Sequence, residues 1–196
     1  WGSAASEKFY SGPGSHNTEV MQKYINAFQK YFYSKLNDLT VLDLGCGDFN
    51  IGSQLYNKVK NYIGIDVVPG LITRNKKLYN AKNLTFFCLD IVKDELPDGD
   101  CILLREVLQH LTNNEVAIIL EKLYSYKYVI ITESIPIGNF NANLDKIKGP
   151  ESRSYLNSGL IIHKPPFSFR YQLKKELLKI KRPGIDYLIT TLYIKN

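Results

Sequence analysis

The stretch VLDLGCGDFN, residues 41–50, is an apolar run that ends in an acid, followed by two glycines one residue apart and a second acid. This pattern predicts a buried strand that stops at a tight turn, where glycine lets the backbone approach a ligand. The turn alone leaves three classes of ligand open: a triphosphate, a dinucleotide or another nucleoside derivative.

Four more apolar runs follow at residues 61–66, 84–89, 100–105 and 127–133, with helical segments between them. In the last of these segments, Thr112 and Glu115 form a capping-box pattern ahead of an apolar stripe. Apolar strands that alternate with helices are typical of a parallel sheet covered on both faces. We therefore predict an α/β fold, a Rossmann-like doubly wound sheet with helices on both faces.

The terminal run 186–194 predicts one more strand, and the turn sequence KRPG before it indicates an antiparallel pair at the C-terminal edge of the mostly parallel sheet. The chain of 196 residues is long enough for one domain with a substantial core. Within this domain, 1–196, we expect three regions: an N-terminal lid and helix (1–38), a cofactor-binding core (39–135), and acceptor-side loops with terminal strands (136–196).

The composition narrows the class of protein. The net charge of +6 and the pI near 9.1 permit an anionic partner, although the lysines are scattered apart from the segment KKELLKIKR, residues 174–182. No apolar run approaches the length of a membrane span. The three cysteines are odd in number and lack paired metal-type spacing, which predicts reduced buried thiols, no metal site and a cytoplasmic location.

Polar residues stand at the ends of all five predicted parallel strands. In open α/β sheets, ligands bind beyond the carboxyl ends of the strands, so we expect these groups to converge at one edge. The groups, in strand order, are Asp43 with the turn Gly45-Cys46-Gly47-Asp48, then Asp66, Asp90, Arg105-Glu106 and Glu133.

The turn lacks the pattern of a triphosphate loop and disfavours a dinucleotide, so that a nicotinamide-dependent enzyme is only a remote alternative. A triphosphate loop needs a glycine, four residues and then Gly-Lys-Ser/Thr, which the chain lacks here. A dinucleotide site favours a third small residue where this chain has Asn50. Asp66 suits a ribose diol and Asp90 suits an adenine amino group, so the pattern indicates an adenosyl sulfonium ligand.

In the motifs VLDLGCGDF, YIGIDVV, FFCLDI and LLREVLQHL, the chain resembles the class I S-adenosylmethionine-dependent methyltransferases over roughly residues 10–135. The resemblance implies S-adenosylmethionine as cofactor and S-adenosylhomocysteine as product. It also implies the residues that bind the cofactor: Asp43, Gly45, Cys46, Gly47, Asp66, Val67, Asp90, Ile91 and Arg105. The usual third glycine of the first motif is Phe49 in this chain.

Two further segments resemble a smaller group of bacterial methyltransferases associated with polysaccharide (capsule) modification. These are YSGPGS at 10–15, and R-x-x-L-N with PPF at 153–167. By the same resemblance, Tyr10 and Ser15 are candidate lid residues over the cofactor.

Methyl transfer to a hydroxyl requires alignment and a base. His110 is our first candidate, since it follows the fourth strand by about one turn of helix and histidine titrates near neutrality. Glu106 and Glu133 are the other catalytic candidates. Packing of His110 in the wall of the site and a favourable helix-start charge for Glu106 are the alternative interpretations.

These observations favour O-methylation of a small molecule or a nucleotide- or glycan-linked precursor, with oligomeric state left open. An RNA or DNA methyltransferase is the alternative that the basic pI supports. The base-methylation signature ending in Pro-Pro-aromatic would have to follow the fourth strand, whereas KPPF lies at 164–167. A protein that binds S-adenosylmethionine without catalysis is the third hypothesis.

Overall fold

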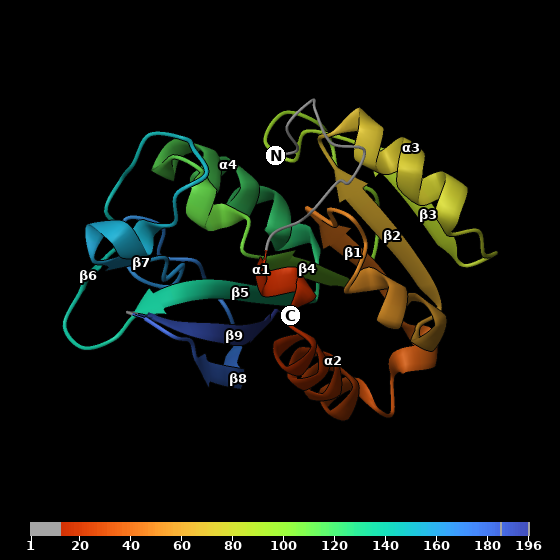
Figure 1. Ribbon diagram of the computed structural model, residues 1–196, viewed down its shortest axis with the longest axis horizontal. Coiled ribbons are helices and arrows are strands. Elements are labelled where there is room, and N and C mark those ends of the chain that lie inside the picture. Colours follow the sequence, from red (N-terminus) through yellow and green to blue (C-terminus); the bar gives the residue numbers. More distant parts are fainter. Residues whose placement is uncertain (1–12, 185, 196) are drawn as a thin grey trace. The chain divides into compact units, whose positions relative to one another are not determined.

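The computed structural model describes residues 13–184 and 186–195 (Figure 1). The predicted lid residue Tyr10 therefore lies outside the described residues. The chain divides into two compact units, Trp1–Cys101 and Ile102–Asn196, and we describe each by itself.

The first unit contains three parallel strands in the order β3-β2-β1. Its elements are α1 (Pro13–His16), α2 (Thr18–Phe32), β1 (Thr40–Leu44), β2 (Asn61–Asp66), α3 (Pro69–Leu78) and β3 (Leu84–Cys88), and Cys101 at its end begins β4 (Cys101–Arg105). The apolar runs 40–44 and 61–66 predicted the first two strands, and both pairs of bounds are confirmed.

Helix α2 lies in the region 1–38 where the sequence predicted a helix, and it has one buried face. Its buried residues are Tyr24, Ile25, Phe28 and Phe32, which recur at three- and four-residue spacing. Asn17 caps the N-terminus, because its side chain accepts a hydrogen bond from the Val20 N–H at 3.0 Å. One side of the helix is therefore buried.

Strand β3 differs from the prediction of a buried strand. Only Phe86 among its five residues is buried, while Phe87 is 40% exposed and the Cys88 thiol is also exposed. The physical reason is position, since β3 is the first strand in the sheet order and has a neighbouring strand on one side. Cys46 and Cys101 are buried as predicted.

The connections between the predicted parallel strands are less helical than expected. Within residues 40–128, all of which the structure describes, α-helices follow β2 and β4, as α3 and α4 (Asn113–Lys122). Short 3-10 turns join β1 to β2, and a turn-rich segment joins β3 to β4. Pro97 and Gly99 in the latter segment oppose a continuous helix.

The second unit carries the antiparallel edge. Its elements after β4 are α4, β5 (Tyr128–Pro136), the short strands β6 (Asn141–Ala142) and β7 (Ser158–Gly159), β8 (Leu173–Lys181) and β9 (Asp186–Ile194). Strand β9 lies between β5 and β8 and is antiparallel to both, which Figure 1 shows in green and blue. The predicted strand 186–194 and the antiparallel pair at the C-terminal edge are thus confirmed.

The N-terminus of α4 confirms the predicted capping box. The Thr112 side chain accepts from the Glu115 N–H at 3.2 Å, and the Glu115 carboxylate accepts from the Thr112 N–H at 3.0 Å. Val116, Ile119, Leu120 and Leu123 form the buried stripe.

The seven strands have the order β3-β2-β1-β4-β5-β9-β8, a mostly parallel sheet with one antiparallel edge pair. The fold is α/β and Rossmann-like, as the sequence predicted. Across the part of the chain that the structure describes, no helix is both long enough and apolar enough to cross a membrane.

Candidate active site

The turn after β1 depends on glycine at two positions. Gly45 and Gly47 have φ values of 81° and 55°, in the left-handed region where a side chain costs about 1–2 kcal/mol. The N–H groups of Gly45 and Cys46 both donate to the Ile65 carbonyl of β2, at 2.8 and 2.9 Å. The turn is therefore held directly at the end of β2, where Asp66 stands.

Asp66 connects the glycine turn to the start of α3. Its Oδ2 accepts from the Gly47 N–H at 2.9 Å and its Oδ1 from the Val68 N–H at 3.0 Å. Burial raises the pKa of this carboxyl, and the backbone N–H groups partly oppose the shift. Because each carboxylate oxygen has two lone pairs, both can accept one more hydrogen bond, as a vicinal ribose diol requires.

Asp43 is held by a buried tyrosine. The Tyr62 hydroxyl donates to Asp43 Oδ2 at 2.8 Å, and only 8% of Asp43 is exposed. Burial raises the pKa of Tyr62 well above its ordinary value, and the negative charge of Asp43 adds to the shift. Tyr62 therefore stays a neutral donor and fixes the orientation of this carboxylate.

Cys46 takes no nucleophilic role in the turn. Burial raises the pKa of its thiol well above the ordinary value, and the charges of Asp43 and Asp66 raise it further. A protonated thiol is a weak nucleophile, so Cys46 contributes backbone and volume to the turn.

Helix α3 supports the turn from the other side through residues that the sequence analysis did not identify. The fully buried Asn75 donates from Nδ2 to the Gly47 carbonyl at 2.8 Å, and Arg74 donates to the Asp48 carbonyl at 3.2 Å. Both residues stand in a polar run, residues 73–77, so the sequence pattern did not single them out.

The N-terminal segment is also tied to this turn. His16 Nε2 lies 2.6 Å from Oδ2 of Asp48, whose side chain is buried, and Asn50 donates to the Ser15 carbonyl at 2.6 Å. The sequence predicted Ser15 as a lid residue and gave His16 no role. The structure places both residues beside the turn.

Phe49 stands where the first motif usually has its third glycine. Its backbone has the left-handed conformation that glycine adopts most easily. Its φ is 65°, and its ring is fully buried. Four aromatic rings surround it, with centroids 4.8–6.2 Å away, namely those of Tyr56, Tyr62, Tyr79 and Phe86. This aromatic packing compensates for the backbone strain.

Asp90 follows β3 by two residues and organises a compact turn. Its Oδ1 accepts from the Val92 N–H at 3.0 Å, and Lys93 lies 3.4 Å from its Oδ2. The side chain is 24% exposed, so it keeps access to solvent. Ile91 is half-buried, and Val67, after β2, is 59% exposed.

The donor set of the first unit fits S-adenosylmethionine. It has three parts: the glycine turn with its left-handed backbone, the Asp66 carboxylate, which is held by backbone N–H groups and can accept further hydrogen bonds, and the partly exposed Asp90 carboxylate. In the described residues there is no cluster of three or more His, Cys, Asp and Glu side chains that could hold a metal ion.

The catalytic candidates and Arg105 lie in the second unit. Glu106 directly follows β4 with a left-handed φ of 55°, and its N–H donates to the Thr132 carbonyl at 2.8 Å. Arg182 donates to Glu106 Oε1 at 2.7 Å, while the Arg105 guanidinium lies 3.8 Å from Oε2. Asp186 also binds Arg182, through two hydrogen bonds of 2.9 Å.

Arg182 is the functional candidate that the sequence did not reveal, since it was interpreted only as part of the lysine-rich segment 174–182 and of the turn KRPG. Nearby carboxylates raise the pKa of Arg182 against the effect of burial. The guanidinium stays charged and holds Glu106 in its strained conformation.

His110 ends a short 3-10 helix, Leu108–His110. Burial lowers the pKa of its imidazole, and the positive charge of Lys146 lowers it further, whereas Glu106 acts in the opposite direction. The ring is therefore neutral at pH 7 and has the protonation state of a base. Its role in proton transfer stays a prediction.

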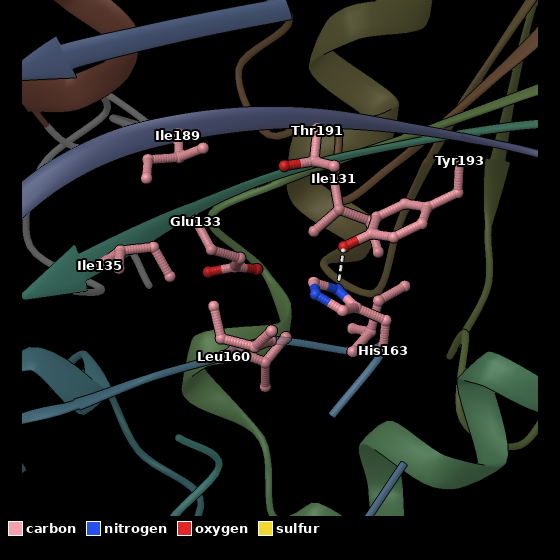
Figure 2. Close-up of a pocket in the computed structure, with 10 residues that line it drawn as sticks. Ile131, Glu133, Ile135, Leu160, His163, Ile189, Thr191 and Tyr193 are labelled. Carbon is pink, nitrogen blue, oxygen red and sulfur yellow. Dashed lines mark hydrogen bonds between the residues drawn. The ribbon is translucent and has the colours of Figure 1, made fainter. Parts of the chain in front are cut away.

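Glu133 lies at the inner wall of a small cavity of about 60 Å³ (Figure 2). It is 2% exposed, and its Oε1 accepts from the Leu108 N–H at 3.0 Å. Burial raises the pKa of this carboxyl well above its ordinary value, and the charge of Glu106 adds to the shift. The apolar part of the wall is formed by Ile131, Ile135, Leu160, Ile161, Ile162 and Ile189.

Comparison with known proteins agrees with this geometry. Residues 41–126 match the family model described as "Methyltransferase domain". This match covers 86 of the 196 residues. No curated protein has a significantly similar sequence.

Solved structures of methyltransferases share the fold. The N-methyltransferase NodS from Bradyrhizobium japonicum WM9, in complex with S-adenosyl-L-homocysteine, is 14% identical with a TM-score of 0.65, covering 92% of this chain and 89% of NodS. The N-terminal domain of EvdMO1, in the presence of S-adenosylhomocysteine and D-fucose, is 12% identical with a TM-score of 0.66, covering 92% and 84%. The bifunctional kinase-methyltransferase WbdD is 17% identical with a TM-score of 0.62, covering 95% and 43%.

The family match and the shared fold agree with the geometry of the site in indicating a methyltransferase. The match begins at Val41, the first residue of the motif that opens the sequence, and extends past β4 and α4. It therefore covers the glycine turn, Asp66 and Asp90, as well as Glu106 and His110.

Proposed function

We propose that the protein transfers a methyl group from S-adenosylmethionine to a hydroxyl group of a small molecule or a glycan precursor. The observation that carries the proposal is the carboxylate of Asp66, which accepts from Gly47 in the turn and from Val68 ahead of α3. The two hydrogen bonds fix the Asp66 oxygens in place beside the glycine turn, where the absence of side chains lets a ligand approach the backbone.

The bound cofactor supplies a methyl group that its sulfonium already activates. The residues of the chain bind this cofactor and orient it. Asp66 accepts hydrogen bonds from the ribose hydroxyls, Asp90 and the Ile91 backbone hold the adenine, and Asp43 orders the ammonium group. Gly45 and Gly47 admit the methionine portion, while Cys46 and Val67 contribute to the walls and Arg105 faces the methionine end.

For a hydroxyl acceptor, the chain must also remove a proton. A neutral His110 accepts it in our proposal, because burial keeps its pKa below neutrality. Arg182 positions Glu106, whose charge would stabilise the imidazolium that forms. Region 39–135 acts as the cofactor-binding core and region 136–196 supplies acceptor contacts.

A small or glycan-linked acceptor is supported by two of the structural neighbours. EvdMO1 was crystallised with D-fucose, and WbdD joins a methyltransferase to a kinase. NodS is an N-methyltransferase, so an amine is the alternative acceptor atom. The resemblance of segment 153–167 to capsule-associated enzymes points in the same direction.

Titration calorimetry with S-adenosylmethionine and S-adenosylhomocysteine, with NADH as control, tests the proposal. We expect micromolar binding of the adenosyl ligands and none of NADH. Asp66→Ala should weaken binding by about 1.5–3 kcal/mol, or roughly 10- to 150-fold, since it removes charge-assisted hydrogen bonds.

Asp98→Ala is the matched control, because Asp98 is an exposed acid in the loop before β4. Its affinity should equal that of the unaltered chain. Equal affinities of Asp66→Ala and Asp98→Ala would contradict the ribose assignment, and a complete lack of adenosyl binding would contradict the function.

A further inference from the structure

The cavity of about 60 Å³ in the second unit is lined by Glu133, one oxygen of which has no hydrogen-bond partner among the described residues. Glu133 Oε2 is buried and makes no hydrogen bond within residues 13–184 and 186–195. The carboxyl group points into the cavity in Figure 2, between strand β5 and the segment that carries Leu160 and His163. An unmade hydrogen bond of this kind costs about 1–3 kcal/mol, which a ligand hydroxyl, able both to donate and to accept, would recover.

A lysine contacts the histidine that lines the same cavity. His163 lines the cavity, and its Nε2 lies 3.1 Å from the ammonium nitrogen of Lys174 on β8. An ammonium group can only donate, so Nε2 is the acceptor and Nδ1 carries the proton toward the Tyr193 hydroxyl, 3.1 Å away. Burial lowers the pKa of His163, and the charges of Lys174 and Lys164 lower it further.

The register of the antiparallel strands extends this charge along one face of the sheet. Residues paired across strands share a face, and Ile189, Thr191 and Tyr193 of β9 line the cavity. Their partners on β8 are Lys179, Glu176 and Lys174, and Lys181 pairs with Tyr187 on the same face. Three lysines and one glutamate give this face of β8 a net positive charge; the Lys179 ammonium also lies 4.3 Å from the centroid of the Tyr187 ring.

The wall opposite the strands is rigid. Asn143, 3% exposed, donates from Nδ2 to the carbonyls of Ile161 and Pro165 at 2.9 and 2.8 Å, and its Oδ1 accepts from the Ile161 N–H at 2.7 Å. The segment that carries His163 is thus fixed by one buried amide, so the cavity is built into the fold.

We propose that this cavity binds a hydroxylated small molecule that carries phosphate, with a hydroxyl-bearing group directed at Glu133 and the phosphate at Lys174. A cavity of about 60 Å³ admits one small organic group, while the charged part stays at the rim. A sugar phosphate combines both features, either free or linked to a nucleotide. The inference rests on the proposed function in that this ligand is the methyl acceptor.

Titration with glucose 1-phosphate, UDP-glucose, glucose and inorganic phosphate tests the binding site without turnover. We expect glucose 1-phosphate or UDP-glucose to bind at least tenfold more tightly than glucose or phosphate. Tighter binding of the first identifies a free sugar phosphate as the ligand class, and tighter binding of the second a nucleotide-linked sugar.

Two variants and a control assign the site. Lys174→Gln should weaken binding of the phosphorylated sugar at least fivefold, because it removes the contact with the phosphate. Glu133→Gln should also weaken it at least fivefold, because it alters the contact with the sugar hydroxyl. Lys175→Gln removes the same charge from the neighbouring residue, whose partner Leu192 belongs to the other face, and should leave the affinity unchanged.

S-adenosylhomocysteine affinity of each variant separates the two hypotheses. The cavity proposal is overturned if the sugar phosphates do not bind, or if Lys174→Gln and Lys175→Gln change their affinity equally. If S-adenosylhomocysteine affinity is retained in that case, the proposed function stands. If the sugar phosphates bind as expected but no adenosyl ligand does, the cavity is a binding site and the methyltransferase function fails.

Discussion

Phe49 shows how a single residue can replace a glycine in a strained turn. The position requires a φ of 65°, and the side chain is fully buried among aromatic rings. The same ring occupies the space beside Gly52, where an added Cβ would lie 2.1 Å from a Phe49 carbon. Backbone preference and side-chain packing therefore oppose each other at this residue.

This opposition predicts an unusual order of stability. Phe49→Ala should lower the free energy of unfolding by about 3–5 kcal/mol through lost packing. Phe49→Gly loses the same ring but relieves the left-handed strain, and we expect it to be about 1 kcal/mol more stable than Phe49→Ala. Urea unfolding of both variants measures the difference; an alanine variant more stable than the glycine variant would contradict the assigned backbone strain.

Glu133 should make stability depend on pH. Its pKa is raised above the ordinary value of 4.5 by burial, so the folded chain holds this proton over a range where the unfolded chain has lost it. Stability from this group is present at low pH and falls as pH rises from about 4.5 to the folded pKa, by at most about 1.4 kcal/mol per pH unit.

Glu133→Gln removes this dependence, so its stability relative to the unaltered chain should rise between pH 5 and 8. Urea unfolding at several pH values measures the trend. Glu176→Gln, at an exposed residue, is the control. Parallel profiles for all three chains would show that the Glu133 carboxyl is ionised in the folded state throughout this range.

At the scale of elements, local chemistry specified α4 well. Thr112→Ala should destabilise the chain by about 1 kcal/mol, because it leaves the Glu115 N–H without its capping oxygen. Thr112→Ser keeps the hydroxyl and should lose much less. Chemical denaturation of both variants checks this, and equal losses would mean that the Thr112 methyl group, rather than the cap, stabilises the helix.

The elements also show where prediction from sequence succeeds. Strands β1, β2 and β9 have the predicted bounds because apolar runs end there at Asp, Gly or Pro. The segment 174–182 was interpreted as a charge cluster, whereas Leu173–Lys181 is strand β8. Its lysines obscure the apolar alternation, and pairing with β9 determines its structure.

In the candidate site, too, some residues could be identified from the sequence and others could not. The acids at the strand ends could be identified from their place after apolar runs. The supporting contacts of Asn75, His16 and Arg182 could not, because each joins segments that are distant in sequence. Side chains of this kind become visible only when the fold is known.

At the scale of the whole molecule, the net charge of +6 is the observation that supports a nucleic-acid substrate, and the salt dependence of RNA binding tests this alternative. We expect only weak RNA binding, with about three phosphate contacts and a roughly 15-fold loss of affinity between 50 and 200 mM salt. Fluorescence anisotropy with a labelled oligonucleotide measures this. Submicromolar binding that persists at 200 mM salt would favour an RNA methyltransferase.

Strand β8 ends the sheet order, so one side of its backbone meets no further strand of the described sheet. Such an edge can recruit strands from other molecules and lead to aggregation. Four exposed lysines, Lys174, Lys175, Lys179 and Lys181, and a register shift between Glu176 and Leu178 interrupt it. Mutual repulsion of these lysines would keep copies of the chain from joining edge to edge at high concentration, a protection that neutralising substitutions along β8 would remove.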